Sequence, residues 1–193
     1  MQESFYARHT VSVAKDLLGK ILVHESAEGT TAGLIVETEA YMQDDPACHA
    51  YRGKTLRNAT MFGPPGRAYV YLIYGIHHCF NAVTREEGVG EAVLVRSLAP
   101  LHGEDLMRQR RTTNCQFHRL ASGPGNLCRV MGINREQDGE SLQESPLYVV
   151  YDERAFIPEQ ADIKESKRVG LSVAEDKLLR FSLYSYDNNV SRR

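Results

Sequence analysis

The stretch "KILVHESAEGTTAGLIVETEAYM", residues Lys20 to Met42, decides the fold. Two apolar-rich runs flank a short polar segment, in which Glu28 and Gly29 supply a turn. Strands joined by so short a connection pair in antiparallel fashion. The stretch therefore predicts a β-hairpin.

The second strand of this hairpin raises a functional question, because it carries two carboxylates within an apolar run. Side chains of an extended chain alternate between two faces. Such a strand can be half-solvated, with both carboxylates pointing at water. The other interpretation is that one face belongs to a functional site, and this window alone leaves both open. One predicted face carries Leu34, Val36, Thr38 and Ala40, and the opposite face carries Ile35, Glu37, Glu39 and Tyr41.

Further strands follow along the chain and make the predicted sheet antiparallel. The segments "RAYVYLIY" (67–74), "HHCFNAVTRE" (77–86) and "EAVLVRSLA" (91–99) are separated by short Gly-containing turns, and "PLYVVYD" (146–152) is a later strand. Consecutive hairpins with helices at their sides are typical of the α+β class.

Helix signals occur between these strands. Thr10 to Leu18 predicts an amphipathic helix capped by Thr10 or Ser12 and ended by Gly19. A second helix start is expected at "DDPACHAY" (44–51), with Asp45 as cap and Pro46 at the first helical position. "GEDLMRQRR" (103–111) and "SGPGNLCRVMGIN" (122–134) predict two more helices.

Length and composition are those of an ordinary globular protein. The 193 residues suit a single domain over 1–193, with 25% charged and 42% apolar residues. No apolar run approaches the roughly 18 residues of a membrane helix, and the N-terminal sequence lacks the pattern of a secretory signal. Four cysteines without close pairing suggest reduced thiols, so we expect a cytoplasmic protein.

The charge is distributed unevenly. Residues 46–135 contain twelve basic and five acidic side chains, whereas the rest contains eleven basic and twenty acidic ones. One part of the chain can therefore present a positive face to phosphates although the net charge is −2. Eleven of the twelve basic residues are arginines, which favour fixed phosphate or base contacts.

Several other chemistries find little support. The pairs Cys48-His49 and His77-His78-Cys79 lack the spacing of zinc ligands, and adjacent strand residues point to opposite faces, so we expect no metal. "GPPG" lacks the Lys-Ser/Thr of a phosphate-binding loop. No G-x-S-x-G motif of serine hydrolases is present.

The tyrosines of "YVYLIYGIHHCFN" are more informative. Tyr69 and Tyr71 share one strand face, and Tyr74 ends the strand beside Gly75. Such residues often pack a core. Three hydroxyl-bearing rings within six residues, inside a basic segment, also suit stacking on nucleobases.

Taken together, these motifs resemble the alkyladenine (3-methyladenine) DNA glycosylase family. The resemblance rests on "VETEAY" with a following histidine, "RN" then "MF", G-x-x-Y-V-Y-x-I-Y-G and C-x-N, and then on "VLVRSLAP", "MRQRR", "SGPGNLC", "GIN" and "RVG". It extends from Ala14 to Ser191. It implies a curved antiparallel sheet with flanking helices and a protruding hairpin.

The resemblance also implies that the enzyme extrudes a damaged purine from duplex DNA, since a base inside the stack cannot be reached. Tyr74 would wedge into the gap that the nucleotide leaves. Tyr41 and Tyr71 would sandwich the base, and His49 would hydrogen-bond its edge. Asn81 would lie at the pocket floor and crowd the 2-amino group of guanine.

For catalysis, the resemblance makes Glu39 the residue that deprotonates a water for attack on C1′ and stabilises the sugar cation. Arg96 and the carbonyl of Val190 would help to hold that water. Glu37 has no such role and is expected to be a structural neighbour with an ion-pair or hydrogen-bond partner. No lysine of these motifs suits Schiff-base chemistry, so we expect hydrolysis without strand cleavage and without a cofactor.

The expected substrates are 3-methyladenine, 7-methylguanine, hypoxanthine and ethenoadenine in double-stranded DNA, bound by a monomer. Backbone phosphates are expected at a loop and at the start of the 122–134 helix, whose free N–H groups suit an anion. The residues are Arg52, Lys54, Arg57, Ser122 and Gly123.

The chain departs from the family pattern in two places. It has no tryptophan, and "SYDNNVS" lacks the aromatic residue expected before the C-terminal "VS". His77 and His78 stand where relatives carry aromatic residues. A non-catalytic lesion-binding protein, a zinc-dependent nuclease and an RNA-binding domain are the competing hypotheses.

Overall fold

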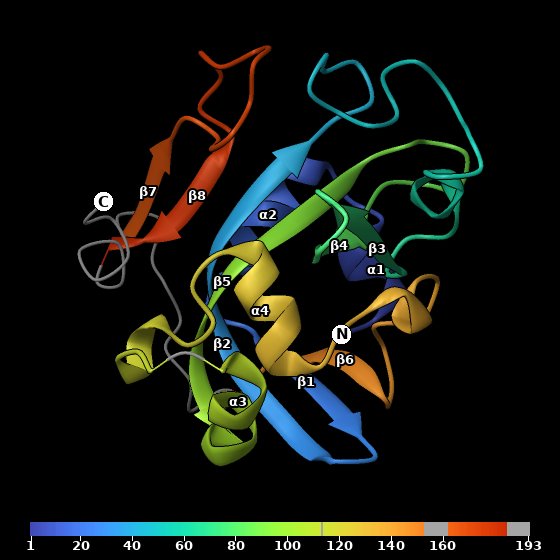
Figure 1. Cartoon of the computed structure of the whole chain (residues 1–193). Coiled ribbons are helices and arrows are strands. Elements are labelled where there is room, and N and C mark those ends of the chain that lie inside the picture. Colours follow the sequence, from blue (N-terminus) through green and yellow to red (C-terminus); the bar gives the residue numbers. More distant parts are fainter. Residues whose placement is uncertain (113, 153–161, 185–193) are drawn as a thin grey trace.

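The computed structural model of the chain describes residues 1–112, 114–152 and 162–184 (Figure 1). Six strands follow the order β3-β4-β5-β2-β1-β6, and β8 pairs with both β2 and β7. Every pairing is antiparallel, as the hairpins predict. The strands are β1 (Ile21–Ser26), β2 (Gly29–Tyr41), β3 (Ala68–Ile73), β4 (His77–Val83), β5 (Ala92–His102), β6 (Leu147–Val150), β7 (Ile163–Ser166) and β8 (Arg180–Leu183).

The helices lie against this curved sheet, which confirms the α+β class (Figure 1). Both longer predicted helices after β5 are present, and Pro124 stands at the start of the second, as expected. The helices are α1 (Glu3–Tyr6), α2 (Thr10–Leu17), α3 (Glu104–Arg111) and α4 (Pro124–Met131), with short 3₁₀ turns η1 (Ala59–Phe62), η2 (Phe117–Arg119) and η3 (Arg135–Gln137).

Strand β2 is the central element. The β1–β2 turn falls where predicted, with Ser26 paired to Gly29. β2 pairs with β5 along one edge, and with β1 and then β8 along the other. Its residues from Thr31 to Ala40 are all buried. The half-solvated interpretation is therefore wrong, because Glu37 is only 6% exposed and Glu39 is fully buried.

A β-bulge interrupts the pairing of β2 with β5 where the two carboxylates lie. Ile35 pairs with Leu98, Glu37 with Ser97 and Thr38 with Val95, so that the register skips Val36 on β2 and Arg96 on β5. A bulge re-aims the side chains of the strand that carries the extra residue. Arg96 and Ser97 consequently both reach the carboxylate of Glu37.

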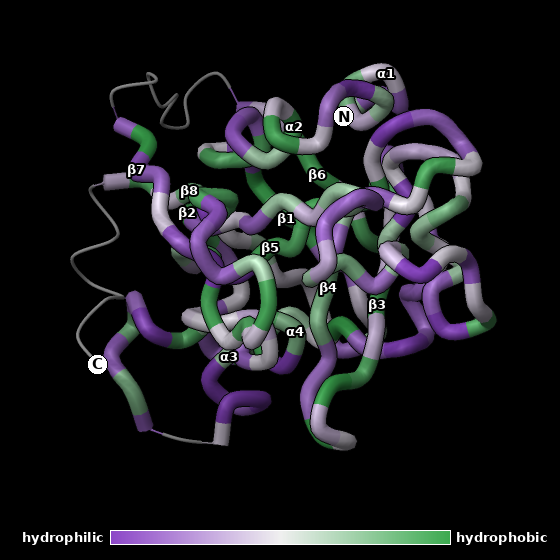
Figure 2. The backbone as a smooth tube through the Cα atoms, turned by 90° about the horizontal axis from the view of Figure 1, so that it is seen from above, coloured by the Kyte–Doolittle hydropathy of each residue, from purple (hydrophilic) through white to green (hydrophobic). Residues whose placement is uncertain are grey.

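The β3–β4 hairpin projects from the body of the molecule (Figure 2). At its tip, Tyr74 and Gly75 have φ angles of 52° and 72°. Glycine adopts that conformation freely, whereas a tyrosine there is uncommon and strained. The strained turn holds the Tyr74 side chain out, 82% exposed, beside the exposed Ile76.

Two helix predictions need correction. The segment from Asp45 forms turns rather than a helix, because its backbone hydrogen bonds close separate turns between residues three apart and do not continue into a helical ladder. The Asp45 carboxylate still accepts from Ala47 N–H through one oxygen, and its other oxygen forms a buried ion pair with Arg168. Thr10 is the first helical residue of α2, not its cap, since its hydroxyl contacts Thr84 and Glu91 instead. Gly19 follows that helix with a φ of 78°, as expected of a helix-ending glycine.

Two groups of buried apolar residues support the sheet. The larger group consists of side chains from α2, α4 and the strands that pack against them. Leu22, Ile35, Phe80 and Leu127 are among its members. The smaller group includes Phe62 and Tyr69, and the partly buried rings of Tyr41 and Tyr71 pack against it. This second group gives the aromatic side chains of the site a fixed base.

Candidate active site

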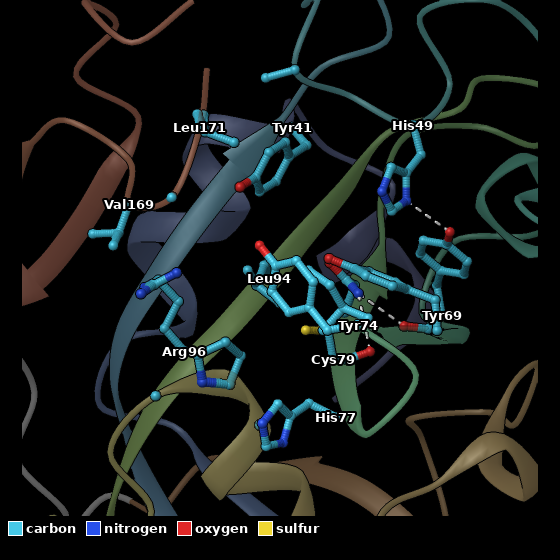
Figure 3. A pocket seen from close by; sticks show the side chains of 18 of the residues that line it. Tyr41, His49, Tyr69, Tyr74, His77, Cys79, Leu94, Arg96, Val169 and Leu171 are labelled. Atoms are coloured by element: carbon cyan, nitrogen blue, oxygen red, sulfur yellow. Dashed lines mark hydrogen bonds between the residues drawn. The ribbon is translucent and has the colours of Figure 1, made fainter. Parts of the chain in front are cut away.

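A cavity of about 420 Å³ opens between the ends of β2, β3, β4 and β5, the start of α4 and residues 169–171 (Figure 3). The predicted pocket residues Tyr41, His49, Tyr71 and Asn81 all line it, and so do Tyr74 and Arg96. Four tyrosines and two histidines stand among the lining residues, which suits a flat, mostly apolar ligand. The sequence therefore identified side chains from four separate segments that meet around one space.

His49 is held against two tyrosines. Its Nδ1 lies 3.0 Å from the Tyr69 hydroxyl, and its ring meets Tyr71 edge-on with centroids 4.6 Å apart. Burial, with a contribution from Arg57, lowers the pKa of His49. The imidazole is thus neutral at neutral pH and offers one donor and one acceptor nitrogen.

Asn81 has a fixed orientation. Its amide nitrogen donates to the carbonyl of Tyr69 at 3.0 Å and reaches that of Cys79 at 3.5 Å. These two acceptors require the NH₂ group, so the amide oxygen is the polar atom that remains for the cavity. Cys79, the cross-strand partner of Tyr71, lines the cavity beside it, and burial together with this thiol raises the pKa of Tyr71.

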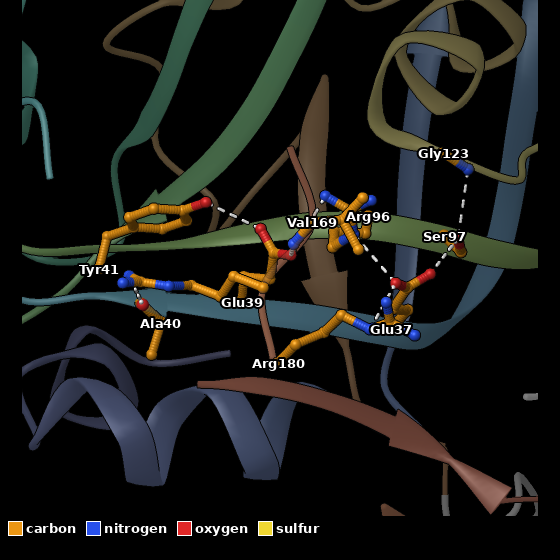
Figure 4. Close-up of polar contacts among 10 residues, drawn as sticks. Glu37, Glu39, Ala40, Tyr41, Arg96, Ser97, Gly123, Val169 and Arg180 are labelled. Carbon is orange, nitrogen blue, oxygen red and sulfur yellow. Dashed lines mark hydrogen bonds and ion pairs between the residues drawn. The ribbon is translucent and has the colours of Figure 1, made fainter. Parts of the chain in front are cut away.

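Glu39 lies behind the cavity wall, fully buried, with two hydrogen-bond donors and one ion-pair partner (Figure 4). Oε2 accepts from the Tyr41 hydroxyl at 2.8 Å, and Oε1 accepts from Val169 N–H at 2.9 Å. Arg96 Nη1 lies 3.3 Å from Oε1. All three partners line the cavity, so Glu39 is separated from it by a single layer of residues. A carboxylate has about four lone-pair positions, and one is left for a further donor.

Glu37 has the structural partners that we expected of it. Its carboxylate accepts from Arg96 Nε at 2.9 Å and from the Ser97 hydroxyl at 2.8 Å, and Arg180 Nε lies at 3.2 Å. Burial lowers the pKa of Arg96, but the charges of Glu39 and Glu37 outweigh it and raise the pKa overall. Arg96 is therefore a fixed cation that bridges both carboxylates (Figure 4).

The segment Arg168–Val169 was missed as a contributor to the site. Both residues form hydrogen bonds to the end of β2. Arg168 donates to the Ala40 carbonyl, and the N–H of Val169 donates to the Glu39 carboxylate. The "RVG" motif was the available signal, but a contact across about 130 positions cannot be read from local spacing. Val190, the residue predicted for this neighbourhood, lies outside the described residues, as does the C-terminal "VS".

The residues predicted to contact phosphates lie in two regions, the loop after β2 and the start of α4. Arg52, Lys54 and Arg57 are exposed in the loop after β2. Gly123 lines the cavity and Ser122 adjoins it, but the N–H of Gly123 already donates to the Ser97 hydroxyl at 3.2 Å. The free amides that we expected at this helix start therefore do not include that of Gly123.

The competing metal hypothesis gains no support from the geometry. Cys48 lies against the carbonyl of Gly90, and His49 contacts Tyr69. Within the part of the chain that the structure describes, no three His, Cys, Asp or Glu side chains are placed to hold a metal ion. Nor is any helix of this part long and apolar enough to cross a membrane.

Comparison with known proteins identifies the family. A family model described as methylpurine-DNA glycosylase matches residues 4–187. The chain belongs to the methylpurine-DNA glycosylase family. It is accordingly a DNA glycosylase, an enzyme of DNA repair that acts on DNA.

Curated relatives agree with this assignment. The family member from Methanoculleus marisnigri is 53% identical over 190 residues, 98% of this chain and 97% of the relative. One from Rubrobacter xylanophilus is 51% identical over 81% of this chain and 80% of its own length. One from Carboxydothermus hydrogenoformans is 45% identical over 95% of this chain and 94% of its own length. All three carry the name "Putative 3-methyladenine DNA glycosylase".

Proposed function

We propose that this glycosylase flips alkylated or deaminated purines out of duplex DNA and hydrolyses their N-glycosidic bond with a water that Glu39 activates. The observation that carries the proposal is the buried Glu39 carboxylate, held by Tyr41, Arg96 and Val169 at the wall of an aromatic cavity. A buried carboxylate whose donors line a cavity is a candidate for general-base catalysis.

The base would stack between Tyr41 and Tyr71, with His49 at its edge. The cavity of about 420 Å³ suits a single nucleobase with part of its sugar. Asn81 would lie at the floor and crowd an exocyclic 2-amino group, which disfavours unmodified guanine. Positively charged and uncharged lesions both fit this description: 3-methyladenine, 7-methylguanine, hypoxanthine and ethenoadenine.

In the reaction, a water would take the fourth acceptor position of Glu39. Its oxygen attacks C1′, its proton passes to the carboxylate, and the electron pair of the glycosidic bond leaves with the base. Glu39 also opposes the positive charge that builds on the sugar, because its buried carboxylate is little screened by bulk solvent. Neither a Schiff base nor strand cleavage is part of this scheme.

Tyr74 would fill the gap left by the flipped nucleotide. It stands 82% exposed at the tip of the projecting hairpin, and it also lines the cavity (Figure 3). Its position at both the tip and the rim suits a wedge between the duplex and the pocket. Arg52, Lys54 and Arg57 would bind the backbone nearby, Arg57 being close enough to affect the pKa of His49.

The test is incubation of the protein with duplexes that each carry one of the four lesions, with and without a chelator. The expected result is free base, an intact sugar-phosphate strand and no effect of the chelator. Tight binding without released base would favour a lesion-binding protein, and activity lost to the chelator would favour a metal-dependent nuclease. Cleavage of the strand would exclude simple hydrolysis.

A further inference from the structure

Arg168 is buried against the ring of Tyr41. Its guanidinium carbon lies 4.7 Å from the ring centroid, its Nη1 donates to the Ala40 carbonyl at 3.1 Å, and its Nη2 donates to Asp45 at 2.7 Å. The side chains of Arg168 and Asp45 are both fully buried. Tyr41 lines the cavity whereas Arg168 does not, so the ring stands between this cation and any ligand.

The buried charges around the ring are balanced. Within the described residues, three carboxylates (Glu37, Glu39 and Asp45) contact three guanidinium groups (Arg96, Arg168 and Arg180). The half-exposed ammonium of Lys177 lies 3.5 Å from Asp45 and adds positive charge. This cluster offers a positively charged purine no net negative charge, which leaves the aromatic faces to attract it.

The two faces of one aromatic ring are not independent. A cation over one face is attracted by the quadrupole of the ring, and a second cation over the other face is repelled by the first. An uncharged base stacked on the same face is not repelled by the first cation. Arg168 should therefore weaken the stacking of charged purines on Tyr41 and leave that of uncharged purines almost unchanged.

We propose that Arg168 is a specificity-determining residue that reduces the preference of the pocket for positively charged over uncharged purines. This inference rests on the proposed function, in which Tyr41 stacks on the flipped base. It assigns Arg168 no contact with the base. Its effect passes through the ring and depends on how far Asp45 neutralises it.

The test compares single-turnover release of 7-methylguanine, which is charged, with that of hypoxanthine, which is not, from duplexes of the same flanking sequence and at one pH. The readout is the ratio of the two rates in each variant relative to wild type. A general packing defect lowers both rates and leaves this ratio alone. The ratio therefore separates an electrostatic role of Arg168 from a merely structural one.

Three variants form a graded series. Asp45→Asn leaves the guanidinium uncompensated and should lower the ratio. The double variant Arg168→Gln/Asp45→Asn removes both charges and should raise it about threefold to thirtyfold, the range of a desolvated cation–π contact. Arg168→Lys keeps the charge and the Asp45 partner, so its ratio should stay closer to wild type than that of the double variant.

Lys177→Glu tests the same idea at a half-exposed position, in case the buried variants do not fold. It replaces a positive charge beside Asp45 by a negative one, so the ratio should rise. A ratio at the wild-type value in both the double variant and Lys177→Glu would overturn the inference. Wild-type protein that releases neither base would contradict the proposed function itself.

Discussion

The hydroxyl of Tyr41 donates a 2.8 Å hydrogen bond to the carboxylate of Glu39, two residues earlier on the same strand face. Burial, together with the charge of Glu39, raises the pKa of Tyr41, so the hydroxyl keeps its proton and remains a donor. A ring of the cavity wall and the proposed catalytic group are thus joined directly.

Tyr41→Phe should therefore slow base release with little effect on the affinity for damaged duplex. The ring still stacks, but the carboxylate loses one of its two hydrogen-bond donors. A hydrogen bond to a charged group contributes about 1.5–3 kcal/mol. Single-turnover rates and duplex dissociation constants measure the two effects separately. Tyr71→Phe is the matched control, because Tyr71 lies opposite Cys79 and donates no hydrogen bond to Glu39. An equal loss in both variants would argue against the link.

Asn81→Ser should relax discrimination against guanine. The shorter side chain no longer reaches the carbonyls of Tyr69 and Cys79, and it makes room for a 2-amino group. Release of unmodified guanine by the variant and by wild type is the measurement. Unchanged selectivity would place the floor of the pocket elsewhere.

Tyr74→Ala should impair excision from a paired duplex far more than from a substrate whose lesion is already unpaired. Flipping costs a few kcal/mol and costs least at a mismatch, whereas a stacked wedge contributes roughly 1–3 kcal/mol. The tip is exposed, so the substitution leaves the core intact. The same lesion is compared in both contexts, and equal losses would show that Tyr74 acts within the pocket.

The lowered pKa of His49 predicts a pH-dependent stability. As the pH falls, the unfolded chain takes up the proton near the ordinary value of about 6.5, before the folded protein does. The neutral imidazole makes its full contribution to the free energy of unfolding above about pH 6.5. That contribution is lost as the pH falls from about 6.5 to the lower pKa of the folded protein. Urea unfolding across this window should show a shallower loss for His49→Gln than for wild type, and parallel losses would contradict the burial effect.

Local patterns predicted the β1–β2 hairpin and the three following strands, because alternation and Gly-containing turns act over a few residues. The projecting hairpin was expected only from the family resemblance. Local patterns could not predict the bulge at Arg96, which depends on the register between two strands. Nor could they predict the Arg168–Asp45 pair, which joins positions 123 residues apart.

The structure also changes what Glu37 can be used for. From the sequence, Glu37→Gln is an active control for Glu39→Gln. In the folded protein, Glu37 holds Arg96, which in turn contacts Glu39. Glu37 is therefore unsuitable as an inert control, and the exposed Glu144 is a better one.

The most direct test of the account is release of a damaged purine by Glu39→Gln, with Glu144→Gln as the matched control. The amide keeps the shape of the side chain but cannot accept the proton of the attacking water. Base release should fall by a factor on the order of 10² or more, while binding to the damaged duplex stays close to that of wild type and of the control. Near-normal release by the folded Glu39→Gln variant would remove Glu39 from the mechanism.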